Sequence, residues 1–210
     1  MFNFLQLYTY LQFYNKQMIV NEIFYSLQGE GFFTGTPSLF IRFSGCNLQC
    51  SFCDTKHQKG LKMTEEEIAA KAAQCPAKHV VITGGEPSLQ LTASLVELLH
   101  QQDKFVAVET NGTHPLPTNV DWITLSPKSP FIHTDKAKVC LKKCNELKVV
   151  YTGQPLSDFS YIKSDNYFLQ PCETEDTEQN KRILKETIAY CLSHPQWRLS
   201  LQTHKLIGVR

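Results

Sequence analysis

The sequence lacks an excess of charge of either sign. Its 210 residues include 21 Lys and Arg and 20 Asp and Glu, so the formal net charge is +1 at pH 7. Proteins whose main partner is a nucleic acid or an anionic membrane surface usually carry a clear excess of basic residues. The balance argues against both classes, and we expect neither nucleic acid nor membrane as a partner.

The sequence also lacks an apolar run of the roughly 18–20 residues that a membrane-spanning helix needs. Residues 1–17 lack the basic start and the small-residue cleavage site of a secretory signal. We interpret them as an N-terminal extension, because the first clean strand pattern begins at Met18. The remainder, 18–210, is predicted to form a single domain, since 42% hydrophobic residues suffice for one core.

Cysteine is abundant instead: the chain has eight. Disulfide frameworks are typical of short secreted chains with poor cores, so we place this protein in a reducing cytoplasm. Clustered cysteines in that compartment indicate a metal or catalytic site. Cys46, Cys50 and Cys53 form such a cluster. The other five are interpreted as free thiols without an assigned function: Cys75, Cys140, Cys144, Cys172 and Cys191.

Strand-like and helix-like segments alternate along the chain. Strands are predicted where Val, Ile, Phe and Tyr concentrate, over 19–25, 38–44, 79–83, 105–109, 122–125, 147–151, 167–170 and 198–202. Helices are predicted over 64–74, 92–102 and 177–193, with a short helical turn over 138–145 that would put Cys140 and Cys144 on one face. The first helix opens with a capping box, Thr64 to Glu67. In the third, we expect Ile183, Leu184, Ile188, Cys191 and Leu192 to face inward.

This alternation indicates an α/β fold with a mostly parallel sheet and helices outside it. A complete eightfold barrel usually takes about 250 residues. Helix signals also become sparse after Phe105. The sequence therefore favours a partial, reduced TIM-like β/α barrel.

The cysteine cluster, Cys46-x3-Cys50-x2-Cys53, directly follows a predicted strand. Loops at the carboxyl ends of barrel strands are where such folds build their sites. Three thiolates can hold three irons of a 4Fe–4S cluster and leave the fourth iron open. Alternatively, His57 can complete a tetrahedral Cys3His zinc site. Spacing alone does not decide between these two.

A second motif does bear on the choice. Thr83-Gly-Gly-Glu-Pro87 follows the next strand, where two glycines allow the backbone to approach a ligand closely. Together with the cysteine motif it resembles the radical S-adenosylmethionine (SAM) superfamily. There three cysteines bind the cluster, SAM chelates the open iron, and the GGEP loop holds the methionine amine. His57 would then be an exposed loop residue.

Further stretches extend the resemblance over nearly all of the chain after Met18. They are FYSLQGEG from Phe24, RFSGCN from Arg42, CDT from Cys53, ETNG from Glu109, LSPK from Leu125, LQP from Leu169 and LQTHK from Leu201. This set resembles the 7-carboxy-7-deazaguanine synthase family. The resemblance implies a carbon–nitrogen lyase that converts 6-carboxy-5,6,7,8-tetrahydropterin to 7-carboxy-7-deazaguanine with loss of ammonia, for queuosine or deazapurine biosynthesis. It also implies a 4Fe–4S cluster, SAM, Mg²⁺, a homodimer and a one-electron reductant of the flavodoxin or ferredoxin type.

The resemblance implies these site residues, with no catalytic group beyond the cluster and the SAM-derived radical. The cluster ligands are Cys46, Cys50 and Cys53, and Thr55 contributes a hydroxyl to Mg²⁺. SAM is bound by Phe52, Cys53, Asp54, Gly84, Gly85, Glu86, Glu109, Asn111, Ser126, Pro127, Lys128, Gln170, Pro171, Cys172 and Glu173. The substrate is bound by Leu27, Gln28, Gly29, Glu30, Arg42, Thr83 and Arg210, the last through the end of the chain.

Arg42 is notable even without the resemblance. It lies in the middle of an apolar strand, LFIRF, where an unpaired buried guanidinium would be costly. By pattern it either points to solvent or has an anionic partner inside. The resemblance gives it the substrate carboxylate, bound through a bidentate fork.

Two functions of other classes were compared with this one. An activase that makes a glycyl radical on a partner protein usually carries additional ferredoxin-like cysteines, which Cys140-x3-Cys144 does not resemble. A zinc-binding RNA module built on the three clustered cysteines and His57 predicts a basic face. The neutral charge balance and the GGEP loop disfavour it.

Overall fold

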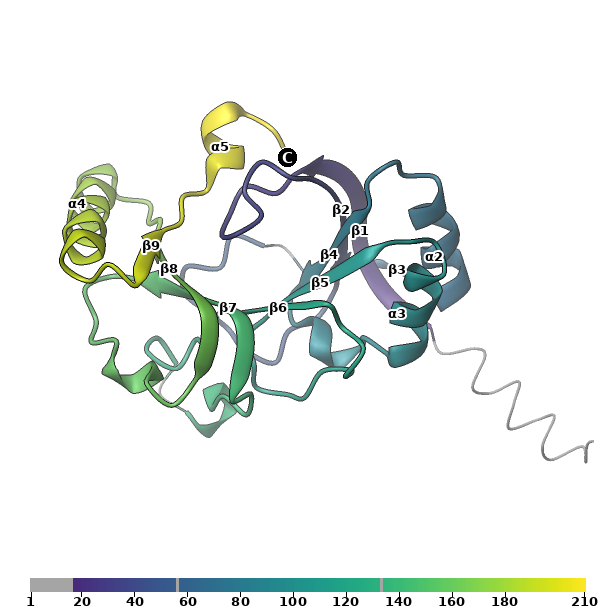
Figure 1. The fold of residues 1–210 in the computed structure, drawn as a ribbon, viewed down its shortest axis with the longest axis horizontal. Helices are drawn as coiled ribbons and strands as arrows, with labels where there is room; N and C mark the ends of the chain where they lie inside the picture. Colours follow the sequence, from purple (N-terminus) through teal and green to yellow (C-terminus); the bar gives the residue numbers. More distant parts are fainter. Residues whose placement is uncertain (1–16, 56, 133) are drawn as a thin grey trace, which may run out of the picture.

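The computed structural model describes residues 17–55, 57–132 and 134–210. The predicted extension, 1–17, therefore lies outside the described residues except for Gln17. Nine strands form one sheet in the order β3-β1-β2-β4-β5-β6-β7-β8-β9 (Figure 1). Neighbours from β2 to β9 are parallel, whereas β1 pairs antiparallel with β2 and β3. The predicted α/β fold with a mostly parallel sheet is confirmed.

The strands are β1 (Met18–Leu27), β2 (Pro37–Phe43), β3 (Leu61–Met63), β4 (His79–Gly84), β5 (Phe105–Thr110), β6 (Trp122–Leu125), β7 (Lys143–Tyr151), β8 (Lys163–Pro171) and β9 (Trp197–Leu199). The α-helices are α2 (Glu65–Ala73), α3 (Ala93–His100), α4 (Thr177–Ser193) and α5 (Thr203–Ile207). Short 3₁₀ turns are η1 (Pro87–Leu89), η2 (Asp135–Ala137) and η3 (Ser157–Phe159).

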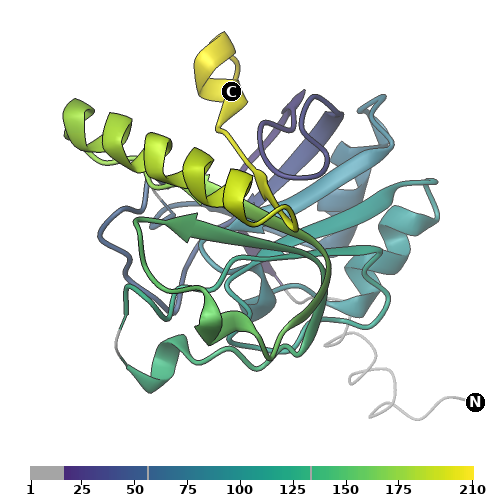
Figure 2. The ribbon, with the colours of Figure 1, turned by 60° about the vertical axis from the view of Figure 1, so that its left-hand side comes forward.

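The sheet curves into an open barrel whose outer face is covered at both ends (Figures 1 and 2). Helices α2 and α3 cover the β1–β5 end, α4 packs on β8 and β9, and α5 lies over the open side. The crossovers after β5, β6 and β7 contain no α-helix among their described residues. This matches the predicted loss of helix signals after Phe105.

Side-chain alternation along the strands separates a core outside the barrel from a polar interior. Ile41, Ile82 and Val108 point outward into an apolar cluster with α2 and α3. Leu147 and Leu169 belong to a second outward cluster near η3 and β9. Because successive side chains point to opposite faces of a sheet, their neighbours in sequence point inward. These inward neighbours are Arg42, Thr83, Glu109, Lys148 and Gln170, which all line one cavity.

The β1–β2 loop closes one end of the barrel with aromatic rings. Phe33 contacts His79, Phe105 and Trp122, with ring centroids 4.4, 5.8 and 4.8 Å away. These three are the first residues of β4, β5 and β6. The aromatic cluster therefore lies under the amino ends of the strands, at the end opposite the strand-following loops that carry the cysteines.

Most predicted elements are confirmed. Helix α4 has the predicted bounds, and the Thr64–Glu67 capping box has both of its hydrogen bonds, 3.2 and 2.8 Å long. Strand β3 was not predicted, because three residues at a sheet edge give little pattern. Strand β9 ends earlier than expected, at Leu199.

Two predictions are wrong. The expected helical turn over 138–145 is absent, because Lys143 and Cys144 start β7 and pair with Lys163 and Ser164 of β8. Cys140 and Cys144 therefore share no helix face. In α4, Ile188 and Leu192 are 40% and 79% exposed rather than inward, because the stripe that packs on the sheet passes through Ile183 and Thr187.

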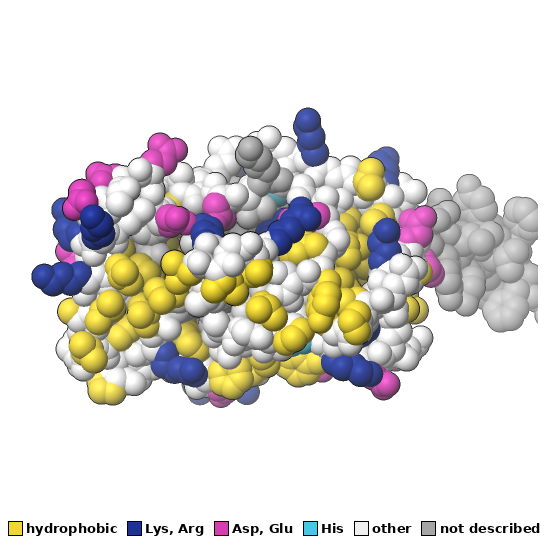
Figure 3. Space-filling view, turned by 90° about the horizontal axis from the view of Figure 1, so that it is seen from above, with side chains coloured by type: hydrophobic (Ala, Val, Ile, Leu, Met, Phe, Trp, Pro, Cys, Tyr) yellow, Lys and Arg dark blue, Asp and Glu magenta, His cyan; other side chains and the backbone are white. Residues whose placement is uncertain are grey.

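On the face that carries α5, Lys and Arg side chains are interspersed with Asp and Glu (Figure 3). The visible part of that face, among the described residues, shows no large patch of one sign. No α-helix within the described ranges is long and apolar enough to cross a membrane.

Candidate active site

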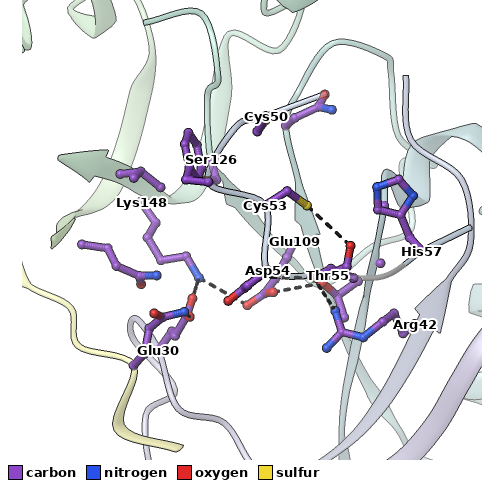
Figure 4. A pocket seen from close by; sticks show the side chains of 18 of the residues that line it. Glu30, Arg42, Cys50, Cys53, Asp54, Thr55, His57, Glu109, Ser126 and Lys148 are labelled. Atoms are coloured by element: carbon purple, nitrogen blue, oxygen red, sulfur yellow. Dashed lines mark hydrogen bonds and ion pairs between the residues drawn. The ribbon is translucent and has the colours of Figure 1, made fainter. Parts of the chain in front are cut away.

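One cavity of about 750 Å³ occupies the inside of the open barrel (Figure 4). Its walls come from the inner faces of β1, β2, β4, β5, β7 and β8, from the loop after β2, and from the α5 region. Every site residue expected from the sequence lines it except Pro127. The structure thus brings together residues from Leu27 to Arg210 that lie far apart in the chain.

The cluster loop, residues 44–58, carries the three clustered cysteines and begins where β2 ends. The Gly45 amide donates to the His57 carbonyl over 2.8 Å, which ties the two ends of the loop together. The Cys53 amide donates to the Cys50 carbonyl, and the Leu48 amide to the Cys46 sulfur. Burial raises the pKa of the Cys46 and Cys50 thiols. Free thiols there are therefore mostly protonated near neutral pH.

The GGEP loop follows β4 and packs directly on the cluster loop. A Cβ on Gly85 would overlap the carbonyl of Gly45, and a Cβ on Gly84, at φ +140°, would overlap the backbone of Phe43. The Glu86 amide donates to the Gly45 carbonyl over 2.9 Å. Glycine is needed at both positions because only it permits this approach.

Glu86 is 1% exposed, and its carboxylate bonds the protein around it. It accepts from the Ser88 amide at 3.0 Å, and from the Thr110 hydroxyl and the Asn111 amide at 2.7 Å each. Its oxygens therefore join the GGEP loop to the end of β5. What the loop offers a ligand is its backbone rather than this carboxylate.

Lys128 enters the cavity from the segment after β6. Its Nζ lies 2.6 Å from the Ser126 hydroxyl oxygen and 5.8 Å from the centroid of Phe52, next to the last cysteine. Burial lowers the pKa of this ammonium, and the Cys50 thiolate would oppose that shift. The Lys128 ammonium, a hydrogen-bond donor, therefore lies beside the cluster loop.

Helix α5 connects to both sides of the cavity through Lys205. The Lys205 ammonium lies 3.1 Å from the Asp54 carboxylate and also pairs with Glu173, which follows β8. Burial lowers the Lys205 pKa, but its hydrogen bonds to the two carboxylates outweigh burial and the pKa is raised. The C-terminal segment thus holds the cluster loop against the end of β8.

Arg42 points inward and has an anionic partner, as one of the two predicted orientations requires. Its Nε donates to Glu22 of β1 over 2.9 Å, and Nη1 lies 3.5 Å from the Thr55 hydroxyl. Glu22 also pairs with the Arg210 guanidinium, which lies over the Phe24 ring. One carboxylate therefore serves two arginines at this end of the cavity.

A buried polar network crosses the cavity from β7 (Figure 4). Lys148 Nζ lies 2.6 Å from Glu30 and 3.5 Å from Glu109. Glu109 also accepts from Gln28 and Thr83, at 3.2 and 3.1 Å. Carboxylates, an amide and a hydroxyl thus converge on one small volume.

The comparisons with known proteins agree with this geometry. A model of the radical SAM superfamily matches residues 40–146. The chain is 50% identical to a 7-carboxy-7-deazaguanine synthase of Bacteroides thetaiotaomicron over 191 residues, 91% of this chain and 98% of the relative. A protein of the same name from Bordetella pertussis is 41% identical, with 90% and 98% covered. The crystal structure of QueE from Escherichia coli superposes with a TM-score of 0.71 at 30% identity, covering 91% of this chain and 96% of that one.

The chain belongs to the 7-carboxy-7-deazaguanine synthase family. It is therefore an enzyme of the radical SAM type, as the sequence motifs predict. Membership of this family implies a 4Fe–4S cluster and SAM.

The residues present fit these two groups. The three cysteines line one cavity, and they lie near enough for a charge on one to raise the pKa of another, as Cys53 does for Cys46 and Cys50. Two glycines leave room for close approach beside them. No trio of His, Cys, Asp or Glu in the described ranges is arranged around a single ion. A 4Fe–4S cluster binds each thiolate to its own iron, so it does not need three protein ligands around a single ion.

Several cavity residues were not predicted from the sequence: Phe24, Phe40, Lys148, Gln202 and His204. Lys148 had a usable signal, because a lysine inside the apolar run LKVVY of a central strand must find an anionic partner. Gln202 and His204 lie within the LQTHK stretch that supported the resemblance. Phe24 and Phe40 look like ordinary strand aromatics, and nothing local shows that their stacked rings, 4.8 Å apart, face the cavity.

Proposed function

We propose that this chain converts 6-carboxy-5,6,7,8-tetrahydropterin to 7-carboxy-7-deazaguanine with loss of ammonia, for the queuosine pathway. The observation that carries the proposal is the shared cavity. Thiols for a cluster, glycine-rich backbone for SAM and a network of carboxylates for a polar heterocycle all face it. SAM bound beside the cysteines would thus lie in the same cavity as the substrate, where the two can be in contact.

At the cluster end, Cys46, Cys50 and Cys53 would bind three irons. When bound, the cluster and SAM supply the radical that takes a hydrogen atom from the substrate. The backbone carbonyls of Gly84 and Gly85 would accept hydrogen bonds from the methionine amine of SAM. The other SAM contacts of this proposal are Phe52, Asp54, Glu86, Asn111, Ser126, Pro127, Lys128, Gln170, Pro171, Cys172 and Glu173. The resemblance also implies Glu109 for SAM, but its carboxylate bonds Gln28 and Thr83, so we propose it as a substrate contact instead.

At the substrate end, Arg42 would bind the pterin carboxylate. Its Nε is taken by Glu22, so the Nη atoms remain to form the charge-assisted hydrogen bonds. The ring edge would meet the segment Leu27–Gln28–Gly29–Glu30 together with Thr83. Arg210 would close this end, since its guanidinium shares Glu22 with Arg42.

Thr55 is our proposed protein ligand for Mg²⁺. Its hydroxyl lies 3.5 Å from Arg42 Nη1 and from the Asp54 carboxylate, next to the proposed position of the substrate carboxylate. A hydroxyl alone is a weak ligand for a hard cation, so the substrate carboxylate and waters would complete the shell. Thr55→Ala should lower the rate and the magnesium response while iron and sulfide content stay unchanged. An unchanged magnesium response would contradict this assignment.

The activity is tested by anaerobic incubation of the reconstituted protein with SAM, dithionite, Mg²⁺ and 6-carboxytetrahydropterin. Mass spectrometry should detect 7-carboxy-7-deazaguanine and 5′-deoxyadenosine. A Cys50→Ala variant should form neither, whereas Cys75→Ala, outside the cavity, should form both. Production of 5′-deoxyadenosine without any deazaguanine would keep the radical chemistry and overturn the substrate.

The resemblance also leads us to propose a homodimer and a flavodoxin- or ferredoxin-type electron donor. Sedimentation equilibrium of the reconstituted protein tests the first, with a monomer as the contrary result. Turnover with reduced flavodoxin in place of dithionite tests the second. No product with either carrier would contradict it.

A further inference from the structure

Lys148 holds a central place in the cavity that the proposed function leaves unexplained. It lies in the middle of β7, points into the barrel and is only 5% exposed. Its ammonium lies 2.6 Å from Glu30 Oε2 and 3.5 Å from Glu109 Oε1. The two carboxylates come from the β1–β2 loop and from β5, so Lys148 connects opposite walls of the cavity (Figure 4).

The same two carboxylates organise the rest of the network. Glu30 Oε1 accepts from the Gln202 side chain over 2.9 Å. Glu109 Oε1 accepts from Gln28, and its Oε2 accepts from Thr83. Moving either carboxylate would therefore displace residues on β4, in the β1–β2 loop or beside α5.

We propose that Lys148 is a positioning residue that fixes the Glu30 and Glu109 carboxylates as hydrogen-bond acceptors for the N–H groups of the pterin ring. The proposal rests on the proposed function for the identity of the substrate. A reduced pterin presents its 2-amino group next to the N3–H group, with a further N–H at N8, and all three are donors. Ionised carboxylates are strong acceptors for such donors.

Charge explains why a cation is needed at this position. Two carboxylates that approach each other in a buried cavity repel, and one of them takes up a proton unless a cation lies between them. A protonated carboxyl donates on one oxygen and would then face another donor. Lys148 removes this conflict and, through its short bond to Glu30, fixes the direction of the acceptor oxygens.

The charged groups that face Lys148 support this assignment. They are Glu30, Glu109 and, two residues away on the same strand, Glu146, together with Lys128 and, near Glu30, His204. Burial opposes ionisation of Glu30, yet the charge and hydrogen bond of Lys148 outweigh it and lower the pKa of Glu30 to about 2. Burial raises the pKa of Glu146, which accepts from the Phe32 amide instead. Burial lowers the Lys148 pKa, but the three carboxylates outweigh it and raise it.

The test is Lys148→Met in the reconstituted enzyme with SAM bound, using fluorescent 6-carboxypterin as the binding probe. Wild-type affinity should change little between about pH 5.5 and 7.5, because Lys148 keeps the Glu30 carboxylate ionised over that range. The variant should bind about tenfold or more weakly at the acidic end and recover part of the loss at the alkaline end, as the carboxyl pair loses its shared proton. Its KM for the substrate should rise in the same way. Its iron content and its dithionite-driven cleavage of SAM without substrate should not change.

Lys104→Met is the matched control. Lys104 is also a buried lysine, but its ammonium donates to the backbone carbonyls of Cys75 and Ala77, 2.7 Å away each, and it does not line the cavity. Lys104→Met therefore measures how much probe affinity is lost when a buried ammonium that does not contact the cavity is removed. Equal losses of probe affinity in the two variants would overturn the proposal, as would a Lys148→Met affinity that matches wild type.

Lys148→Arg carries the test if the methionine variant fails to fold. It keeps the positive charge, so its probe affinity should be flat over the same pH range even if it is lower throughout. A pH-dependent affinity in this variant would overturn the proposal. Wild-type enzyme that binds 6-carboxypterin but forms no deazaguanine would instead contradict the proposed function and leave the positioning result to stand.

Discussion

Glu86 is the residue of the GGEP loop whose structural contribution can be worked out most closely. Its buried carboxylate accepts hydrogen bonds from three donors: the Ser88 amide, the Thr110 hydroxyl and the Asn111 amide. Glu86→Gln keeps the size of the side chain but replaces one acceptor oxygen with an NH2 group. The substitution therefore changes hydrogen bonding and charge without leaving a cavity.

Neither orientation of the glutamine amide satisfies all three donors. If the amide oxygen accepts from the Ser88 amide, the NH2 group faces the Asn111 amide. If the side-chain amide is flipped, the NH2 group faces the Ser88 amide instead. Only the Thr110 hydroxyl can rotate and accept. One buried backbone N–H is thus left unpaired at a cost of about 1–3 kcal/mol, and the remaining bonds lose charge assistance worth about 1 kcal/mol each. We expect Glu86→Gln to lower the free energy of unfolding by about 3 kcal/mol or more, where about 3 kcal/mol is the lower end of these combined losses.

Urea unfolding of the reduced apoprotein, followed by far-UV circular dichroism, measures this difference. With a slope of about 2 kcal/mol per molar urea, 3 kcal/mol lowers the midpoint by about 1.5 M. Glu67→Gln is the matched control, because that carboxylate is exposed and accepts only the Thr64 amide in a helix cap. Glu67→Gln should lower the free energy of unfolding by less than about 1 kcal/mol. Equal urea midpoints for the two variants would refute the stabilising effect of the three hydrogen bonds to Glu86.

Three further predictions concern the same cavity. Gly85→Ala should reduce both iron content and SAM affinity about tenfold or more, because its Cβ would overlap a backbone carbonyl of the cluster loop. Gly35→Ala is the control: a Cβ there meets nothing, so the variant should lose only about 1–2 kcal/mol of stability through backbone strain. Lys205→Met should weaken SAM binding a few-fold at low salt and less at high salt, as titration calorimetry would show, since its pair with Asp54 is partly exposed. The pKa of Glu30 is lowered from 4.5 to about 2, so the stability it contributes is present above about pH 4.5 and is lost as the pH falls toward 2. Glu30→Gln should flatten that acid limb of urea-unfolding stability, and an unchanged limb would contradict the pairing.

The sequence predicts local features well where one short pattern determines them. The Thr64–Glu67 capping box and the bounds of α4 depend on residues a few positions apart, and both are found as expected. The turn expected over 138–145 failed because pairing of β7 with β8 overrode a weak helical pattern. Such pairing joins residues that are about twenty positions apart, and no local propensity encodes it.

The cavity residues also differ in whether a local sequence pattern identifies them. Those found from the sequence belong to short motifs such as the cysteine cluster and GGEP. Lys148 belongs to no motif, and its importance comes from Glu30, which is more than a hundred positions away in the chain. Glu86 is expected to contribute to SAM binding, and its carboxylate accepts three hydrogen bonds from the protein, which no local pattern indicates. The burial of Lys148 and Glu86 and the positions of their partners are determined only when the strands assemble into the sheet.

The bulge in β1 shows how an irregularity in backbone pairing can build a site. The register with β2 shifts between Val20 and Glu22. Val20 packs outward in the apolar core, and without the shift Glu22, two positions on, would point outward as well. Because the extra residue reverses the alternation, Glu22 turns into the barrel and meets both Arg42 and Arg210. A bulge that only relieved strain would not need a carboxylate there. We therefore interpret this one as the feature that orients the Arg42 guanidinium and leaves its Nη atoms directed at the cavity.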